Sequence, residues 1–376
     1  MKHVVLLKSR AANFGGLEKS AGRIASAFVE KGAKVTILTT GDAPKNTPSI
    51  AFHAIKTSSW PSFLRMEQFD RFTKSWLKEH PADLVFGMDR NREQTHIRAG
   101  NGVHDAFLQS RELTEGKWKR ISCLFNPMHR KILELERHAF EHPELKKLFT
   151  NSHMVRRQIL ERYKTDPAKI EVIHNGVEWR EMQIDFANWT VMKQETLKRF
   201  HLPTDVFHFL FIGSGYLRKG LHQLLAGLAR LPTRDFHLSV IGKDNKMAEY
   251  IAKVKELGLA NRVRFFGPQS DIRPFYQFAD VLAIPSFYDP FANVTVEALA
   301  MGLFVISSRY NGGSEILTSE NGLIIEDLMK SESVSSALQE GLKHPKTTAS
   351  AQASRDSVKH LDFSLQMNAF MQACLE

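Results

Sequence analysis

The sequence is nearly free of cysteine, because its 376 residues contain only Cys123 and Cys374. Two cysteines so far apart offer neither a disulfide framework nor the ligand spacing of a zinc site. Long apolar runs are also missing, since no stretch approaches the roughly 18 consecutive apolar residues that span a bilayer. The first apolar run, Val4–Leu7, is far too short for a signal peptide. We therefore expect the reduced environment of the cytoplasm.

Two motifs of other chemistries are absent as well. The sequence contains no Asp-x-Asp pair, the motif that would indicate a metal ion holding a diphosphate. We therefore expect no metal and no other cofactor. The pair Gly15-Gly16 follows a predicted strand, but it is not the Gly-x-Gly-x-x-Gly fingerprint of dinucleotide-binding proteins. Paired glycines before a helix N-terminus still let an anion approach the backbone, although a tight turn alone would use the same residues.

Positive charge is in excess. Lys and Arg number 51 against 41 Asp and Glu, which gives a formal net charge of +10. Such an excess favours an anionic partner: nucleic acid, an acidic membrane surface or a phosphorylated substrate. No nucleic-acid module is recognisable, and the charged loops carry glycines rather than stacking aromatic residues. We expect no nucleic acid, and a basic nucleic-acid-binding protein is the alternative from another class.

Predicted strands and helices alternate in two halves of the chain. In the first half, a helix over Leu17–Val29 separates strands at Val4–Leu7 and Val35–Thr39. In the second half, the alternation restarts with the strand Phe207–Ile212 and the helix Leu221–Leu231. Alternation of this kind is typical of parallel sheets with helices on both faces. The sequence therefore predicts an α/β protein with two doubly wound Rossmann-like domains facing a cleft, divided after residue 185.

The first loop of the second half combines glycines with two cations. Gly213 and Gly215 crowd the end of the predicted strand, and Arg218 and Lys219 stand just before the next helix. A guanidinium can grip phosphate oxygens bidentately, and an ammonium adds a compact charge. A solvated Arg-Lys pair would be the ordinary interpretation elsewhere, but the strand–glycine–cation–helix setting favours a site for a departing diphosphate.

A second loop, after the predicted strand Val281–Ile284, carries the acids of the site. A helix is expected to begin near Asn293, which places Asn293 and Glu297 one turn apart on one face. The unpaired amides of a helix start can hold a phosphate, and the carboxylates of Asp289 and Glu297 can accept hydrogen bonds from sugar hydroxyls. Glu297 could also merely complement the helix dipole.

These residues resemble a known family. Asp289 and Glu297, with seven residues between them, are similar to the Glu-x7-Glu motif of the retaining family-4 glycosyltransferases of GT-B fold. More narrowly, the chain resembles the glucosyltransferases of the lipopolysaccharide core. The stretches that carry this resemblance are Arg98–His104, Asn126–Arg130, Asn151–Arg157, His174–Val177, Gly213–Gly220 and Tyr288–Gly302.

The resemblance implies a role for each site residue. Arg218 and Lys219 would clamp the donor diphosphate, Asp289 would contact the transferred sugar, and Glu297 would contact the ribose. His104, beside Asn101 on the acceptor side, would lie near the reacting sugar or the acceptor, although a supporting role is nearly as well favoured. The other donor contacts implied are Gly15, Gly16, Gly213, Gly242, Arg264, Phe291, Ala292, Asn293 and Val294.

The resemblance also implies the reaction. A retaining hexosyltransferase without an enzyme nucleophile would use front-face attack, in which the departing phosphate oxygen takes the acceptor's proton. The expected donor is UDP-glucose and the expected acceptor a lipid-linked heptose, with UDP-GlcNAc or GDP-mannose as alternative donors. Three departures from the family pattern, Asp289 for Glu, Ala292 for Gly and Ser214 for Arg, bear on the donor. GT-B architecture also serves epimerases and phosphorylases.

Two further expectations concern location. Basic residues mixed with Trp118 between Arg111 and Arg137 suit the anionic cytoplasmic face of the inner membrane, although an exposed basic helix would look the same. Residues 186–355 would form the donor domain, and 356–376 would form a C-terminal helix that returns to the first domain, as in relatives.

Overall fold

The computed structural model describes residues 1–9, 16–40, 47–58 and 61–375 of the chain. These residues form two compact units, one of residues 1–174 with 367–376 and one of residues 175–366. The first division lies eleven residues before the predicted boundary at 185. Val177 and Met182 explain the difference, because both precede residue 185 and are buried in the core of the second unit.

The first unit contains a seven-stranded parallel sheet in the order β3-β2-β1-β4-β5-β6-β7. Its strands are β1 (His3–Leu7), β2 (Lys34–Thr40), β3 (Ile50–Ile55), β4 (Leu84–Gly87), β5 (His96–Arg98), β6 (Lys147–Thr150) and β7 (Ile170–Val172). Its helices are α1 (Gly16–Glu30), α2 (Ser62–Glu79), α3 (His104–Glu115), α4 (Lys117–Phe125), α5 (Pro127–Phe140) and α6 (His153–Arg162), with a short 3-10 turn at Pro167–Lys169.

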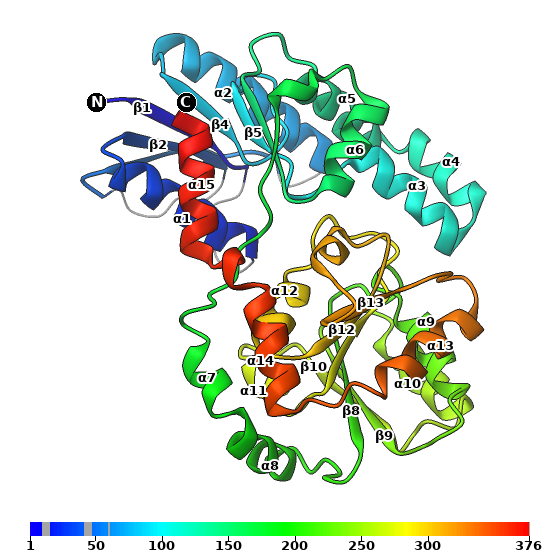
Figure 1. Ribbon diagram of the computed structural model, residues 1–376. Helices are drawn as coiled ribbons and strands as arrows, with labels where there is room; N and C mark the ends of the chain where they lie inside the picture. The colour runs from blue at the N-terminus through cyan, green and yellow to red at the C-terminus, as the bar shows by residue number, and fades with distance from the viewer. Residues whose placement is uncertain (10–15, 41–46, 59–60, 376) are drawn as a thin grey trace. The chain divides into compact units, whose positions relative to one another are not determined.

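Alternate residues of β1 bury their side chains on opposite faces of this sheet, as the period of a strand requires. Val4 and Leu6 pack with α1, whereas Val5 and Leu7 pack with Phe69 of α2. The C-terminal helix α15 (Phe363–Leu375) joins the α1 side, where Phe370, Met371 and Cys374 are buried (Figure 1). Both faces of the sheet are thus covered.

The second unit contains a six-stranded parallel sheet in the order β10-β9-β8-β11-β12-β13. Its strands are β8 (Phe207–Ile212), β9 (Phe236–Ile241), β10 (Val263–Gly267), β11 (Val281–Ile284), β12 (Phe304–Ser308) and β13 (Gly322–Ile325). Its helices are α7 (Gln183–Ala187), α8 (Trp189–Arg199), α9 (Leu221–Ala229), α10 (Met247–Glu256), α11 (Arg273–Phe278), α12 (Asn293–Ala300), α13 (Ser331–Gly341) and α14 (Thr348–Ser357), with 3-10 turns at Gly312–Ile316 and Lys359–Leu361.

Strand β8 shows how this sheet is buried. Phe209 and Phe211 point to the side of α9, α10 and α13, and Leu210 and Ile212 point to the side of α8, α11, α12 and α14 (Figure 1). Complete burial on both faces suits strands read as continuous apolar runs. The prediction of two doubly wound Rossmann-like sheets is confirmed.

Strand order fixes where a ligand would bind in each unit. In both sheets the first strand lies between the second and the fourth, so the crossovers on its two sides run in opposite directions. Ligands of such folds bind beyond the carboxyl ends of the strands at this switch point. The loops after β8 and β11 therefore flank the expected site in the second unit, and those after β1 and β4 do so in the first.

Gly220 closes the loop after β8 in a conformation that only glycine adopts easily. Its φ is +76°, and a Cβ there would lie 1.9 Å from the carbonyl oxygen of Pro285. Gly258 also has a positive φ, +68°, but a Cβ there would meet no atom within 4 Å. The two glycines share the backbone strain and differ in the close contact.

We expect Gly220→Ala to lower the stability of the second unit by about 1–3 kcal/mol more than Gly258→Ala, because only the first adds a steric clash to the left-handed conformation. Urea unfolding of both variants beside the wild type measures the difference. Equal shifts of the two midpoints would contradict the close approach of Gly220 to Pro285.

Candidate functional site

The two loops at the switch point of the second unit lie against each other. One runs from Gly213 to Gly220 after β8, and the other follows β11. The backbone N–H of Phe287 donates to the carbonyl of Arg218 over 2.8 Å, and the Arg218 guanidinium donates to the carbonyl of Tyr288 over 2.8 Å. Residues 70 positions apart in the sequence are thereby joined beyond the ends of β8 and β11.

Both predicted cations contact the predicted acid. The Lys219 ammonium donates to Oδ2 of Asp289, and Arg218 reaches the same oxygen from 3.3 Å. Lys219 and Asp289 are each only 8% exposed, whereas Arg218 is half-buried. Burial lowers the pKa of Lys219, and Arg218 lowers it further, while Asp289 opposes both. In this state the carboxylate supplies the negative charge that both cations require.

The backbone holds Asp289 firmly in this place. Its N–H donates to the carbonyl of Tyr310 over 2.9 Å, and its carbonyl accepts from Gly312 over 2.8 Å. Its second carboxylate oxygen, Oδ1, accepts the N–H of Phe291 over 3.2 Å. One carboxylate oxygen thus organises the loop, and the other faces the cations.

Asn311 ties this loop to the helix that follows. It is fully buried, and its Oδ1 accepts the backbone N–H groups of Ala292 and Gly313, each over 3.0 Å. Its amide nitrogen donates to Thr295 over 3.1 Å and to Ser307 over 3.0 Å. One side chain thus joins the start of α12, through Ala292 and Thr295, to β12 and to the 3-10 turn that follows it.

Helix α12 begins at Asn293, where the sequence predicts it. The capping residue is Ala292, and no side chain caps the helix. The first amides of a helix have no partner within the helix, and the helix dipole favours an anion beside them. Asn293 is exposed, and its Oδ1 accepts from Asn175 over 2.7 Å. The backbone from Phe291 to Val294 thus presents an uncapped helix start near Asp289.

Glu297 lies one turn further along α12 and is half-buried. Its Oε2 accepts the hydroxyl of Tyr276 over 2.8 Å, and Tyr276 is itself buried. Burial and the Glu297 carboxylate hold the pKa of Tyr276 well above its ordinary value, so this hydroxyl is a constant donor. Tyr276 therefore fixes the direction in which Glu297 points.

Gly213 makes room for the Lys219 side chain, and Gly242 makes room for the backbone of Gly213. A Cβ on Gly213 would lie 3.0 Å from the stem of Lys219, and one on Gly242 would lie 2.1 Å from the Gly213 carbonyl. Beside them is a hollow lined by Ser214, Gly215, Lys243, Asp244, Asn245 and Lys246. The loop at Gly242 thus borders a hollow next to the cation loop.

Arg264 lies elsewhere. Its guanidinium donates to the carbonyl of Phe200 and packs over the ring of Phe266 at 4.9 Å. These contacts belong to the packing of β10 against the end of α8. Among the described contacts none joins Arg264 to Arg218, Lys219 or Asp289, so its donor role stays a prediction without support from its neighbours.

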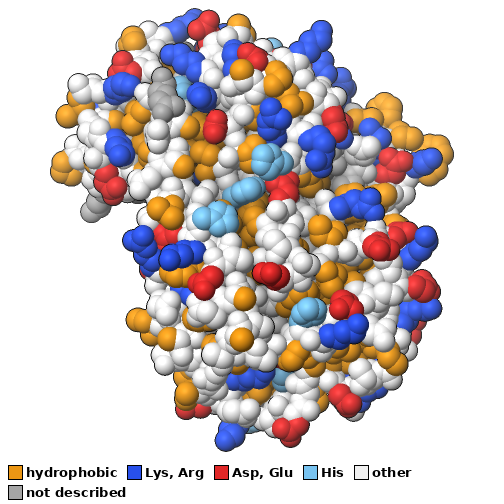
Figure 2. Space-filling model, in the orientation of Figure 1, with side chains coloured by type: hydrophobic (Ala, Val, Ile, Leu, Met, Phe, Trp, Pro, Cys, Tyr) orange, Lys and Arg blue, Asp and Glu red, His pale blue; other side chains and the backbone are white. Residues whose placement is uncertain are grey.

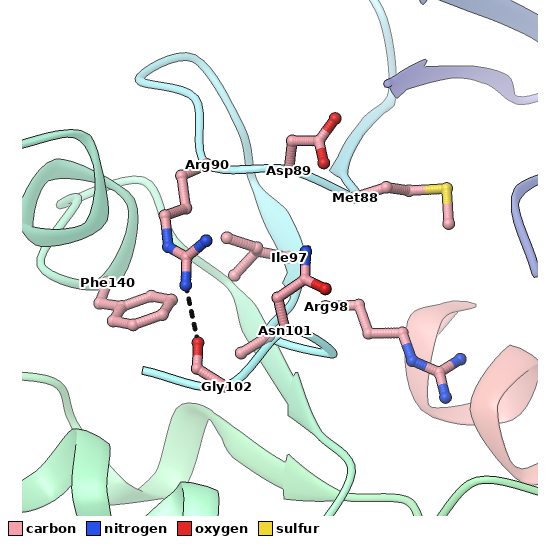
Figure 3. A pocket seen from close by; sticks show the side chains of 9 residues that line it. Met88, Asp89, Arg90, Ile97, Arg98, Asn101, Gly102 and Phe140 are labelled. Atoms are coloured by element: carbon pink, nitrogen blue, oxygen red, sulfur yellow. Dashed lines mark hydrogen bonds between the residues drawn. The ribbon is translucent and has the colours of Figure 1, made fainter. Parts of the chain in front are cut away.

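In the first unit, Asn101 and His104 belong to the loop after β5 and to the start of α3. Asn101 lines a small cavity together with Asp89, Arg90 and Gly102, and Figure 3 shows the Arg90 guanidinium turned toward the Gly102 carbonyl, 2.8 Å away. His104 is the first residue of α3. Gly16 begins α1, and Gly15 lies outside the described residues.

The sequence does not predict several residues that shape the loops at the two switch points. Asn311 lies 22 residues after Asp289 with no motif to join them. Lys8 and Asp89 follow β1 and β4, and the Lys8 ammonium lies 3.0 Å from the Asp89 carboxylate, which also accepts from Ser9. Strand order alone could have suggested this pair, since the ends of β1 and β4 are neighbours in a doubly wound sheet.

Two family models match the chain. The model described as Glycosyltransferase Family 4 covers residues 14–179, and the model described as Glycosyl transferases group 1 covers residues 192–355. The chain belongs to the glycosyltransferases of group 1 and family 4. The family-4 match of this glycosyltransferase lies in the first unit except for residues 175–179, and the second unit holds the group-1 match with the cation and acid loops.

This glycosyltransferase has relatives that cover most of its length. The lipopolysaccharide glucosyltransferase WaaG of Escherichia coli K12 is 26% identical over 339 residues, 88% of this chain and 86% of that protein. The crystal structure of WaaG aligns with a TM-score of 0.77 at 22% identity, over 97% and 98% of the two chains. Anabaena Alr3699/HepE in complex with UDP-glucose aligns with a TM-score of 0.67 at 16% identity, over 99% of each. These structures share the GT-B fold with this chain.

We expect Asn311→Ala to weaken binding of a nucleotide diphosphate as well as the fold, because it frees the Ala292 amide and the Thr295 hydroxyl at the start of α12. The stability loss should be on the order of 3 kcal/mol, from several unmet hydrogen bonds. Asn321→Ala is the control, since Asn321 is as buried and makes three side-chain hydrogen bonds, but it directly precedes β13 and so lies at the amino ends of the strands, away from the candidate site. Calorimetric titration with UDP should separate the two variants, and equal UDP affinity would contradict this role of Asn311.

Proposed function

We propose that this chain is a retaining, metal-independent hexosyltransferase that moves glucose from UDP-glucose to a lipopolysaccharide core or related surface-glycan acceptor. The observation that carries the proposal is the cluster of Arg218, Lys219 and Asp289 beside the uncapped start of α12. Sugar transfer from a nucleotide needs positive charge where the diphosphate leaves and an acceptor of hydrogen bonds where the sugar lies. This cluster supplies both within one unit.

The cluster suggests how a donor would enter. With no donor, Lys219 and Arg218 share the Asp289 carboxylate. A diphosphate would replace Asp289 as the partner of the cations, and the sugar hydroxyls would replace the cations as partners of Asp289. The α12 amides would add further donors to a phosphate oxygen. After the two exchanges both cations still face an anion and the carboxylate is still hydrogen-bonded, which matters for groups as buried as Lys219.

The bond-forming step follows from these positions. The acceptor hydroxyl would attack the anomeric carbon from the face that the diphosphate leaves, and a departing phosphate oxygen would take its proton. The cations and the helix start stabilise the charge that grows on the leaving group, in place as the bond breaks. In this proposal protein cations perform the task that a metal performs in other transferases. Chelator-treated enzyme should therefore retain full activity.

The choice of glucose and of a lipopolysaccharide acceptor is supported by WaaG, a lipopolysaccharide glucosyltransferase, and the choice of UDP-glucose is supported by Alr3699/HepE, whose structure is in complex with UDP-glucose. Incubation of the purified enzyme with UDP-glucose, UDP-GlcNAc or GDP-mannose and a truncated core acceptor tests the choice. An α-linked product from UDP-glucose alone would support the whole proposal. Transfer from another donor would replace the sugar, and donor interconversion without an acceptor would indicate an epimerase.

Lys219→Met should lower kcat about 10²–10³-fold, because one preorganised donor to the leaving group is removed while the buried volume is kept. Lys253→Met is the matched control, since Lys253 lies on α10 and pairs with Glu256 at the surface. Steady-state kinetics with saturating donor measure the effect. Near-normal turnover by Lys219→Met would contradict the diphosphate clamp.

A second observation supports contact with a membrane. Helix α4 exposes a row of large apolar side chains, with Trp118 83% and Phe125 77% exposed, and Ile121 and Leu124 beside them. Figure 2 shows hydrophobic side chains gathered with Lys and Arg where α3 and α4 lie in Figure 1. In the described residues, none of the helices is both long and apolar enough to cross a bilayer. We propose that α4 lies in the surface of an anionic membrane, where a lipid-linked acceptor would be found.

The double variant Trp118→Ser/Phe125→Ser should therefore sediment at least several-fold less with vesicles that contain phosphatidylglycerol, while its transfer to a soluble acceptor stays unchanged. Ile184→Ser/Val191→Ser is the control, because it removes two apolar side chains of similar exposure that lie on α7 and α8 and not on α4. Equal sedimentation of both double variants with the wild type would count against the membrane contact.

A further inference from the structure

Two residues of helix α5 contact His104, one at its backbone and one at its imidazole ring. The carboxylate of Glu136 accepts the backbone N–H of His104, with each oxygen 2.9 Å from the nitrogen. At the ring, Nε2 of His104 lies 3.0 Å from Nδ1 of His129. Both contacting residues come from α5, although His104 belongs to α3.

The spacing of His129 and Glu136 along α5 explains how one helix contacts both the ring and the backbone of His104. His129 lies in the first turn, which the Asn126 side chain caps by accepting the N–H of Met128 over 2.9 Å. Glu136 follows seven residues later, on the same face and about 10 Å further along the axis. The capping residue of α3, Val103, offers no side-chain cap, so Glu136 serves this purpose from a different helix.

The contact between Glu136 and the His104 backbone is held in place by further hydrogen bonds. Glu136 is fully buried, and its oxygens also accept the hydroxyl of Tyr163 over 2.6 Å and the Arg90 guanidinium over 2.5 Å. Burial and the neighbouring carboxylate raise the pKa of Tyr163 above its ordinary value, which keeps this hydroxyl a donor. The backbone of His104 is thus fixed, and what is left to determine is the state of its ring.

The ring is governed by the contact with His129. Burial, Arg90 and His129 lower the pKa of His104 to about 3, and burial, Arg111 and Lys119 lower the pKa of His129. Two neutral imidazoles share one hydrogen bond only if one nitrogen of the contact carries the proton and the other does not. The proton position on His129 therefore decides whether Nδ1 of His104 is a donor or an acceptor. Both rings are half-buried, so each keeps some surface open to solvent.

We propose that His129 is a positioning residue for sugar transfer, whose Nδ1–H donates to Nε2 of His104 and so makes Nδ1 of His104 a hydrogen-bond donor to the acceptor hydroxyl. This inference rests on the proposed front-face reaction. There the single proton of the acceptor hydroxyl goes to the departing phosphate oxygen, so a neighbouring imidazole can orient that hydroxyl only by donating to its oxygen. A bare Nδ1 on His104 would compete for the same proton.

The tautomer is measured by nitrogen NMR of histidine-labelled protein without substrate, with the His104 signals assigned by their loss in His104→Ala. We expect Nδ1 of His104 protonated and Nε2 bare in the wild type. In His129→Phe, which keeps a ring but no nitrogen, the protonation should reverse. The same His104 tautomer in both proteins would overturn the assignment. His138→Phe, the same substitution at an exposed position of α5, should leave these signals unchanged.

Kinetics test the consequence for transfer. His129→Phe should lower kcat on the order of tenfold with the donor KM unchanged. His129→Asn, whose amide can still donate near the Nδ1 position, should recover part of the loss. The double variant His104→Ala/His129→Phe should transfer no more slowly than His104→Ala alone, since His129 acts through His104. Multiplying effects of the two substitutions would overturn this relation.

The two experiments separate this inference from the proposed function. The NMR experiment needs neither donor nor acceptor, so it stands whatever sugar is transferred. Full activity of His104→Ala would refute the acceptor-side role of His104, and with it the effect of His129 on transfer. An impaired His104→Ala with a fully active His129→Phe would refute His129 alone.

Discussion

The contact of Lys219 with Asp289 is the interaction on which the candidate site depends. A buried ammonium and a buried carboxylate tolerate burial only as a pair, because each would carry a large desolvation cost alone. Each comes from a different strand end, so the pair joins the loops after β8 and β11 across the switch point of the sheet. A charge pair in such a place can change partners when a charged ligand arrives.

The surroundings of this pair are built to keep it in place. Gly213 gives the stem of Lys219 its room, Gly220 lets the chain pass the Pro285 carbonyl, and Asn311 fixes the start of α12. Rigidity here has a functional reason, since donors that are already oriented need no rearrangement as charge develops on a leaving group. In the first unit, His104 is fixed in a similar way, because Glu136 accepts its backbone N–H and His129 contacts its ring.

The fold was predictable from local patterns, and so was the part of the site that follows them. Buried parallel strands such as Phe207–Ile212 are continuous apolar runs, and the Glu-x7-Glu-like spacing locates Asp289 and Glu297. The sequence does not predict β5 and β13, which are only three and four residues long, or β3, although five of its six residues are apolar. Helices α7 and α8 are not predicted by the sequence because their apolar residues are sparse. Asn311 and Glu136 could not be found, since their partners are distant in sequence and only tertiary structure brings them together.

The partner exchange at Asp289 is tested most directly by the affinity for UDP of the wild type and of Asp289→Asn, measured by calorimetric titration. If Asp289 competes with the diphosphate for Lys219 and Arg218, the asparagine variant should bind UDP on the order of tenfold more tightly while losing sugar transfer. Weaker UDP binding by Asp289→Asn would contradict the account, because it would mean that the carboxylate supports the diphosphate site rather than occupying its place.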